Sequence, residues 1–377
     1  MIFLNITIDN LYLFKETFFD FTYPRKILDS TINYEYLEEF PNINFKRVNI
    51  IMGANASGKT SFGKIMRNFI NYLNGKEIEN FSKIIENKKE NATIEAIYIL
   101  PENKTINKIN ISFNEENIIS ESFSTLQLQK SWSLKKSLEN IHNTKATFEY
   151  DINNLNYGIT KPSLKSIAVS KGVDLISPNT HWYFQFSDGG DYSQYFRFQD
   201  IDILKRVLQA FDSSITKVVQ IDSETYLITF ENGDKVIIEE GKILNKERLS
   251  RGTQEAIELS SFLNAVIKSN KQKISGTFYL DEKMAYSHSE IEIAMINVII
   301  EKLNRYSQFF YTTHNYDILD MSLPSHSFLF LKRENNHTKV VHPEKLQYTK
   351  NDRSLLNYVK NDVFGTLPNT YLIDELL

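Results

Sequence analysis

Residues 48–61 of the chain read Val48-Asn49-Ile50-Ile51-Met52-Gly53-Ala54-Asn55-Ala56-Ser57-Gly58-Lys59-Thr60-Ser61. The segment from Gly53 to Thr60 matches the phosphate-loop pattern G-x-x-x-x-G-K-[ST]. The five residues before it form a short, mostly apolar run that predicts a buried strand. After the loop, apolar residues recur at helical spacing, at positions 62, 65, 66, 69, 70 and 73. A strand that enters the loop and a helix that leaves it are the context that this pattern needs to bind phosphate.

The loop residues suit a nucleoside triphosphate and its Mg²⁺ ion. Gly53 and Gly58 can adopt backbone angles that other residues avoid, so that successive N–H groups point at an anion beside the positive end of the helix. Lys59 is expected to reach the β- and γ-phosphates, and the Thr60 hydroxyl is expected to ligate Mg²⁺. The other loop residues predicted to line the phosphates are Asn55, Ala56, Ser57 and Ser61. The alternative is a glycine turn before an ordinary helix, but the lysine, the hydroxyl and both flanks favour the phosphate loop.

The composition excludes several classes of protein. Hydrophobic residues make up 41% of the chain and charged residues 24%, as in soluble globular proteins. A formal charge of -4 gives no general reason to expect binding to a polyanion. The absence of cysteine excludes disulfides, thiolate metal sites and cysteine nucleophiles. Because the N-terminus lacks the features of a signal peptide and no apolar run is long enough to cross a bilayer, we expect a cytoplasmic protein without a membrane partner.

The rest of the chain predicts an α/β fold with a phosphate-loop core sheet, an antiparallel β subdomain and an irregular, α-rich insertion. We divide it into residues 1–113 with the loop, the insertion at 114–200, and residues 201–377. Strands are predicted over 1–22, 92–100, 106–113 and 217–238, the last of them with a hairpin turn at Asn232-Gly233, and helices over 126–141 and 202–211. The stretch containing Phe14, Phe18, Phe19 and Phe21 is interpreted as sheet core, with the alternative that one of these rings stacks on adenine.

Two carboxylates and a histidine follow predicted strands in the second half of the chain. Asp281 and Glu282 end the apolar run at 277–280, and His314 ends the run at 309–313. The helical segment between them makes a βαβ unit, so all three residues are expected at the same edge of a parallel sheet. Asp281 is predicted to act on Mg²⁺, Glu282 to orient the attacking water as general base, and His314 to donate a hydrogen bond to the γ-phosphate.

Two helix starts carry further signals. Leu249-Ser250-Arg251-Gly252-Thr253 precedes an apolar helix, an arrangement that caps a helix and can also bind an anion. Ser289 and Glu292 have the spacing of a capping box at the start of the next helix. The pair Asp200 and Asp202 is a possible metal site, but its position at a helix start favours capping.

These pieces together resemble the ATP-binding cassette (ABC) ATPases: phosphate loop, Leu-Ser-x-Gly signature, Asp-Glu and switch histidine, in that order. The resemblance covers the first 75 residues and everything from about residue 200. It implies ATP and Mg²⁺ as cofactors and a head-to-tail homodimer, or a higher homo-oligomer built on it, with two ATP molecules between the subunits. On that basis Ser250, Gly252 and Thr253 act on the γ-phosphate held by the other subunit.

Within this group, the loop and the run Tyr311-Thr312-Thr313-His314-Asn315 look like the SMC/OLD-type ATPases of bacterial phage-defence systems such as Septu and PARIS. Their usual Leu-His-Pro after Asp-Glu is replaced here by Ser-His-Ser, so only His288 matches. The family's glutamine between loop and signature has two candidates, Gln127 and Gln129.

The leading hypothesis is an ATPase switch of an anti-phage system, which closes with ATP, is triggered by DNA or a phage protein, and controls a separate nuclease or toxin. The segment after His314 is expected to be too short for a nuclease domain of about 100 residues. The alternative is a DNA-binding repair ATPase of the RecF or SMC type, with Lys130, Lys135, Lys136 and Lys145 as candidate contacts. A transporter's nucleotide-binding subunit is disfavoured by the variant signature and the large insertion.

Overall fold

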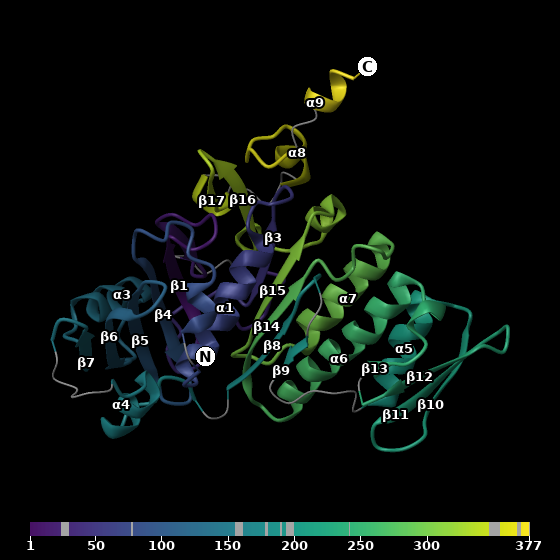
Figure 1. The fold of residues 1–377 in the computed structure, drawn as a ribbon, viewed down its shortest axis with the longest axis horizontal. Coiled ribbons are helices and arrows are strands. Elements are labelled where there is room, and N and C mark those ends of the chain that lie inside the picture. Colours follow the sequence, from purple (N-terminus) through teal and green to yellow (C-terminus); the bar gives the residue numbers. More distant parts are fainter. Residues whose placement is uncertain are drawn as a thin grey trace.

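The computed structural model describes residues 1–23, 30–76, 78–154, 161–177, 180–188, 191–193, 200–240, 242–346, 355–367 and 371–376. These residues form three sheets, of seven, six and four strands. Helices lie between and beside the sheets, as Figure 1 shows. The prediction of an α/β fold with a phosphate-loop core sheet and an antiparallel β subdomain is therefore confirmed.

The seven-stranded sheet has the order β17-β16-β3-β15-β14-β8-β9. Its inner strands β16, β3, β15, β14 and β8 are all parallel, whereas β17 and β9 are antiparallel edges. The strands are β3 (Val48–Met52), β8 (Thr180–Gln185), β9 (Asp191–Ser193), β14 (Ser275–Asp281), β15 (Gln308–Thr313), β16 (Phe328–Glu334) and β17 (His337–Val341). Because the inner strands run the same way, the loops that follow β3, β8, β14 and β15 meet at one edge.

Helices cover both faces of this sheet and give it two hydrophobic cores. Helix α1 (Lys59–Leu73) packs on the face that carries Tyr279 and Phe310. Helices α6 (Arg251–Lys271) and α7 (Ser289–Lys302) pack on the other face, against Phe309 and Tyr311. This alternation of neighbouring residues between two cores explains why the strands read as continuous apolar runs.

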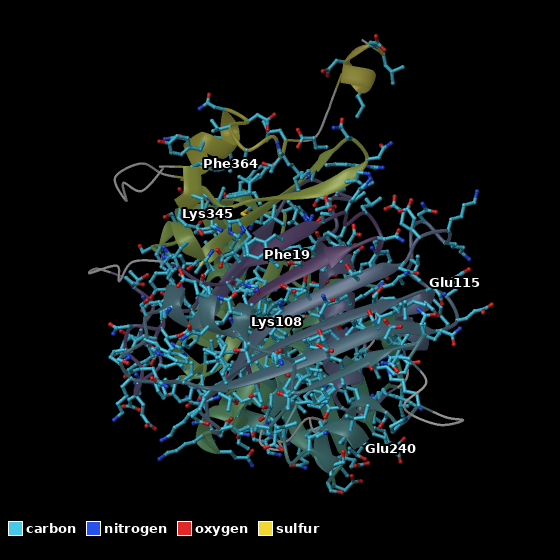
Figure 2. The ribbon with its side chains drawn as sticks, turned by 90° about the vertical axis from the view of Figure 1, so that its left-hand side faces the viewer. Phe19, Lys108, Glu115, Glu240, Lys345 and Phe364 are labelled. Carbon is cyan, nitrogen blue, oxygen red and sulfur yellow. The ribbon has the colours of Figure 1, made fainter. Side chains whose placement is uncertain are left out.

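The six-stranded sheet is antiparallel and covers the outer side of α1. Its order is β2-β1-β4-β5-β6-β7, and Figure 2 shows it from its outer face. The strands are β1 (Ile2–Asp9), β2 (Thr17–Asp20), β4 (Ala92–Leu100), β5 (Thr105–Phe113), β6 (Ile118–Gln127) and β7 (Phe148–Asp151). Helix α3 (Leu134–Asn143) covers part of the outer face over a third core, and α2 (Glu79–Ser82) and α4 (Leu164–Ser170) are short.

The four-stranded sheet is a meander next to the signature segment. Strands β10 (Ile215–Gln220), β11 (Thr225–Phe230), β12 (Lys235–Glu239) and β13 (Lys242–Ile243) follow in order. The predicted turn at Asn232-Gly233 joins β11 to β12, with Gly233 at a positive φ of 85°. Helix α5 (Ile201–Phe211) packs on α6 and is capped by Asp200, whose carboxylate accepts from the Asp202 amide at 3.0 Å, so this aspartate pair is used for capping.

The segment 114–200 differs from the irregular, α-rich insertion expected there. It supplies β6 and β7 to the antiparallel sheet and β8 to the core sheet, beside β14. The helix predicted over 126–141 starts only at Leu134, because the chain up to Gln127 pairs with β5. The predicted division into the ranges 1–113, 114–200 and 201–377 stays a prediction.

The chain ends beyond β17 with the short helices α8 (Leu355–Lys360) and α9 (Tyr371–Asp374), and Figure 1 places α9 away from the sheets. Across the described residues, every helix is too short or too polar to pass through a lipid bilayer.

Candidate functional site

The phosphate loop connects β3 to α1 and depends on its glycines. Gly53, Ala56 and Gly58 have positive φ angles of 152°, 61° and 105°. A Cβ atom on Gly53 would lie 2.3 Å from the carbonyl oxygen of Leu331 in β16, so only glycine fits there. The left-handed residues turn the backbone into a concave loop at the N-terminus of α1, which is the arrangement that binds phosphate.

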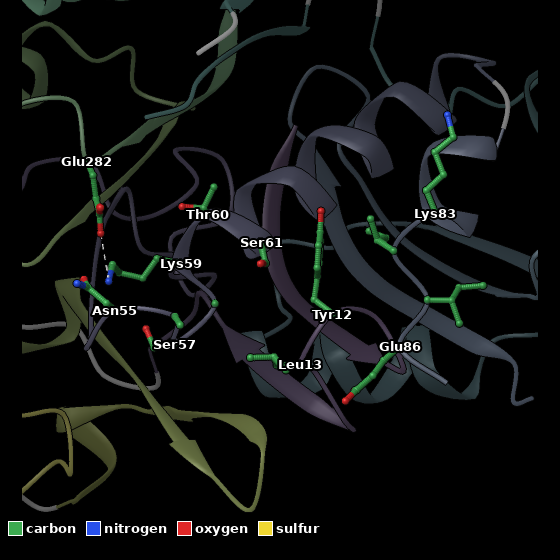
Figure 3. Close-up of a pocket in the computed structure, with 14 residues that line it drawn as sticks. Tyr12, Leu13, Asn55, Ser57, Lys59, Thr60, Ser61, Lys83, Glu86 and Glu282 are labelled. Atoms are coloured by element: carbon green, nitrogen blue, oxygen red, sulfur yellow. Dashed lines mark ion pairs between the residues drawn. The ribbon is translucent and has the colours of Figure 1, made fainter. Parts of the chain in front are cut away.

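The loop is supported from β17 and opens into a cavity. Thr338 donates its hydroxyl to the carbonyl of Ser57 at 2.9 Å, while the Ser57 hydroxyl is buried without a hydrogen-bond partner among the described residues. The cavity has a volume of about 760 Å³, enough for a nucleotide, and Figure 3 shows the side chains around it. Its lining comprises Tyr12, Leu13, residues 55–61, residues 83–86 and Glu282.

Lys59 points back along the loop toward the end of β14. Its ammonium group donates to the carbonyls of Gly53 at 2.7 Å and Ala54 at 3.2 Å, and it pairs with the Glu282 carboxylate at 3.2 Å. Figure 3 shows Lys59 and Glu282 facing each other. The side chain of Lys59 is only 4% exposed. A triphosphate would offer this buried cation stronger, charged acceptors than the two carbonyls.

Asp281 and Thr60 lie together although they are far apart in the sequence. The Thr60 hydroxyl donates to the Asp281 carboxylate at 2.8 Å. Ser187, just after β8, donates to the same carboxylate oxygen at 2.9 Å, and Thr312 donates to the other oxygen at 2.6 Å. A carboxylate and a hydroxyl side by side are the ligands that Mg²⁺ takes when water and phosphate supply the rest of its shell. The residues therefore fit the predicted cation.

Glu282 turns in the opposite direction from Asp281 because its backbone is in the left-handed region, with φ of 47°. Its amide donates to the carbonyl and to the hydroxyl of Thr312, each at 3.1 Å, which holds this conformation. A non-glycine residue in this region is strained, and such strain is common where a side chain must be aimed. Here the Glu282 carboxylate borders the cavity around the phosphate loop rather than the hydroxyl groups that surround Asp281.

His314 follows β15 at the same sheet edge, as predicted. Its imidazole is 56% exposed, and its Nδ1 lies 3.9 Å from the Glu282 carboxylate. A second cavity of about 410 Å³ lies beside it, and Glu282 borders both cavities. The structure therefore brings Lys59, Thr60, Asp281, Glu282 and His314 together at one edge of the sheet.

The signature segment lies apart from this group. Ser250 caps α6, where its hydroxyl accepts from the Thr253 amide at 3.0 Å. The hydroxyl of Thr253 donates to Asp212 at 3.2 Å. A Cβ atom on Gly252 would lie 3.3 Å from the carbonyl oxygen of Tyr286, so the helix start touches the loop after Glu282. None of Ser250, Gly252 and Thr253 lines the cavity around Lys59.

Several charged side chains lie at the contact between α6 and the loop after Glu282. Lys283 is buried and donates to Glu258 at 2.5 Å, and Arg251 donates to the Tyr286 hydroxyl at 2.9 Å. Burial raises the pKa of Glu255 to about 7, although nearby Lys283 acts in the opposite direction. Glu255 lies on α6 itself, close to Lys283 and Tyr286 in the loop that follows β14.

The positions of Phe14, Phe18, Phe19 and Phe21 give no support to the alternative that one of these rings stacks on adenine. Phe14, Phe19 and Phe21 are fully buried, because they pack with Phe62 under the loop and α1. Phe18 is 46% exposed and faces Lys345. The aromatic residue that lines the cavity is Tyr12, which the alternating pattern of β1 does not single out.

Gln127 and Gln129, the two candidates for the family's glutamine, lie far from Asp281. Gln127 donates to the carbonyl of Asn103 in the turn between β4 and β5. The neighbouring residue Glu102 accepts from Ser275, which starts β14, whereas Asp281 ends that strand, about 20 Å away. Gln127 and, two residues on, Gln129 are therefore at the opposite edge of the core sheet.

Sequence reasoning missed the residues that β8 brings to the site. Gln185 pairs with Leu280 next to Asp281, and its side-chain oxygen is buried without a partner among the described residues. Ser187 follows two residues later and binds Asp281. The only sequence signal was the apolar run at 182–186, which the glutamine interrupts.

No protein-family model matches the sequence, and a search of curated proteins finds no relative. Among solved structures, the fold is similar to an SMC head bound to the C-winged helix domain of ScpA, with TM-score 0.48 and 12% identity over 92% of this chain and 100% of that chain. It is also similar to an SMC head domain from Thermotoga maritima, with TM-score 0.39 and 9% identity over 91% and 99% of the chains. A further similar structure is the recombination mediator RecF with ATPrS, with TM-score 0.34 and 12% identity over 90% and 98% of the chains. At these values the likeness concerns the chain path alone, so the function is inferred from the side chains described above.

Proposed function

We propose that this chain is an ABC-type ATPase that binds ATP with Mg²⁺ and hydrolyses it. The observation that carries the proposal is the meeting of Thr60 and Asp281, 2.8 Å apart, beside Lys59 and Glu282, 3.2 Å apart. These four residues come from two segments separated by more than two hundred positions. A phosphate-binding loop by itself supports binding, whereas the added pair of carboxylates supports hydrolysis.

Each side chain has a role that fits its position. The loop backbone and Lys59 bind the β- and γ-phosphates, and Thr60 and Asp281 hold Mg²⁺, which neutralises charge on the phosphates when it is bound. Glu282 accepts a proton from the attacking water, because it borders the cavity and is free of the Asp281 cluster. His314 donates to the γ-phosphate from the neighbouring strand.

Hydrolysis requires a second copy of the chain in this proposal. Ser250, Gly252 and Thr253 do not line the cavity of their own subunit, so a signature that contacts ATP must come from a partner. In a head-to-tail homodimer, each of the two ATP molecules in the interface contacts the phosphate loop of one subunit and the signature of the other. ATP then favours the closed dimer because it gains contacts from both subunits, and hydrolysis removes them.

The biological role that we propose for this switch is control of a separate effector, a nuclease or toxin, in an anti-phage defence system in the cytoplasm. The alternative role is DNA repair of the RecF or SMC type. Lys135 and Lys136 are exposed on α3, where both lie near Glu139 at 3.9–4.0 Å, and that pairing weakens any basic surface. Binding to duplex DNA that falls steeply with salt would favour repair over defence.

The direct test is the Glu282→Gln variant. We expect it to bind ATP as the wild type does by calorimetry but to lose ATP turnover by about a hundredfold or more, because the proton acceptor is gone. Its matched control is Glu290→Gln, an exposed carboxylate on α7, which should leave turnover unchanged. Wild-type protein that neither binds nor hydrolyses ATP with Mg²⁺ would refute the proposed function.

A further inference from the structure

Glu292 is a buried acidic residue that has no role in the mechanism proposed above. It lies in the first turns of α7, is 3% exposed, and faces β15 rather than solvent. A carboxylate is rarely buried this deeply unless its oxygens are fully hydrogen-bonded. The hydrogen-bond partners of Glu292 therefore indicate which segment this carboxylate stabilises.

Among the described residues, three side chains donate to Glu292, and all three belong to the segment that carries His314. One oxygen accepts from the Tyr311 hydroxyl at 2.6 Å and from the Thr313 hydroxyl at 2.9 Å. The other oxygen accepts from the side-chain amide of Asn315 at 2.7 Å. Burial and the nearby Glu292 keep the pKa of Tyr311 well above its usual value, so its hydroxyl stays a donor.

The contacts fix the backbone on both sides of His314. Thr313 accepts from the Asn315 amide at 3.0 Å while it donates to Glu292, so the chain is closed into a tight turn around the histidine. Asn315 in turn caps the following 3₁₀ turn, where its side-chain oxygen accepts from the Asp317 amide at 3.0 Å. Because that bond fixes the orientation of the Asn315 side chain, its NH₂ group points toward α7, where it donates to Glu292 and, at 3.1 Å, to the Ser289 hydroxyl.

The local role predicted for Glu292 is absent. The expected capping box with Ser289 does not form, since α7 is capped at His288 without a side-chain bond and Ser289 donates to Asp317 at 2.5 Å. The carboxylate is thus committed to β15 and the turn after it. It also borders the same cavity of about 410 Å³ as His314 and Glu282.

We propose that Glu292 is a positioning residue that holds His314 at the γ-phosphate by binding both of its neighbours, Thr313 and Asn315. This inference rests on the proposed ATPase function. Glu292 does not touch the phosphate itself. It acts through the turn, so its loss lowers the rate of hydrolysis with little effect on the binding of ATP, most of whose contacts come from the phosphate loop.

The test exchanges the carboxylate of Glu292 and the side-chain amide of Asn315. Glu292→Gln places an amide NH₂ opposite the NH₂ of Asn315, and Asn315→Asp places a second carboxylate opposite Glu292. Each should lower kcat about tenfold and change KM for ATP less than about threefold. The double variant Glu292→Gln with Asn315→Asp restores one donor and one acceptor, and the introduced aspartate can still cap the 3₁₀ turn. It should recover kcat to within about threefold of the wild type.

Controls separate positioning from folding and from the proposed function itself. Glu290→Gln, exposed in the same turn of α7, should match the wild type, and thermal melting and ATP calorimetry should be run on every variant. If Glu292→Gln does not fold, Asn315→Ala removes the same bond while Tyr311 and Thr313 still satisfy the carboxylate. Unchanged kcat in these variants, or a double variant as slow as the singles, would overturn the positioning role while wild-type ATPase activity remains. A wild type without ATPase activity would overturn the proposed function and this inference with it.

Discussion

Gly53 is the position in the loop that tolerates a side chain least. Its φ angle of 152° and the carbonyl oxygen of Leu331, which would lie 2.3 Å from an added Cβ, leave no room for a side chain. The backbone of β16 thus sits directly beneath the phosphate loop. The motif's first glycine is required here by a strand from the far end of the chain as well as by the turn.

We therefore predict that Gly53→Ala destabilises the protein and weakens ATP binding, because β16 or the loop must move. The matched control is Gly233→Ala, at φ of 85° in the open turn between β11 and β12, where nothing lies within 4 Å of the new Cβ. The control should cost about 1 kcal/mol of unfolding free energy from backbone strain alone, and Gly53→Ala should cost at least about 2 kcal/mol. Denaturant titration of both variants checks this. Equal losses would mean that the contact with Leu331 relaxes freely.

At the scale of elements, the contact of α6 with the loop after β14 carries a titratable group. Glu255 lies on α6 next to the signature, and burial raises its pKa to about 7 from a normal value of 4.5. The folded state therefore holds this proton more tightly than the unfolded chain does. Between about pH 4.5 and 7 this residue makes stability fall as the pH rises, and above pH 7 the loss is complete.

Glu255→Gln removes this pH dependence. We expect the melting temperature of the variant, relative to that of the wild type, to rise between pH 5 and pH 8, because only the wild type must bury a charge at the higher pH. Glu290→Gln is again the control, since Glu290 is exposed on α7. A difference in melting temperature that does not change with pH would show that Glu255 is not protonated in the folded protein near neutral pH.

Elements whose signals are local could be predicted from the sequence. The loop from Gly53 to Thr60, the hairpin turn at Asn232 and the cap at Ser250 each depend on a few neighbouring residues, and each forms where predicted. Strand β8 could not be placed in this way, because its membership of the core sheet depends on β14, nearly a hundred residues later. Gln185 lies in β8 and Ser187 follows it, so these two residues could not be placed at the site from the sequence either. The same dependence on distant partners explains why Glu292 binds β15 rather than completing a capping box with Ser289.

At the scale of the whole molecule, the phosphate loop and the signature are separate surfaces of one chain. Ser250 caps α6 beside the loop that follows β14, while Lys59 faces the cavity next to β3. In the proposed function, one copy therefore holds the phosphate loop of one ATP site and the signature of the other. This separation makes the proposed homodimer open to a test by complementation.

Mixing two inactive variants should restore activity. Ser250→Arg blocks the signature, and Lys59→Ala removes the phosphate contact, so each alone should lack ATP turnover. A mixed dimer contains one site with both an intact Lys59 and an intact Ser250, which gives about a quarter of wild-type activity for random pairing. ATPase assays of the mixture and of each variant alone measure this. Persistent inactivity of the mixture, with both proteins folded, would argue against signatures that act across the dimer.

The hydrogen bond from Thr338 to Ser57 ties the nucleotide loop to a strand formed more than 280 positions later. A ribosome adds only about 5–20 residues per second, so a nascent chain exposes its loop many seconds before β16 and β17 exist to brace it. During that interval the phosphate loop of the growing polypeptide lacks the support of β16 and β17. If the chain is the ATPase that we propose, a prematurely terminated product without these two strands should fail to bind ATP.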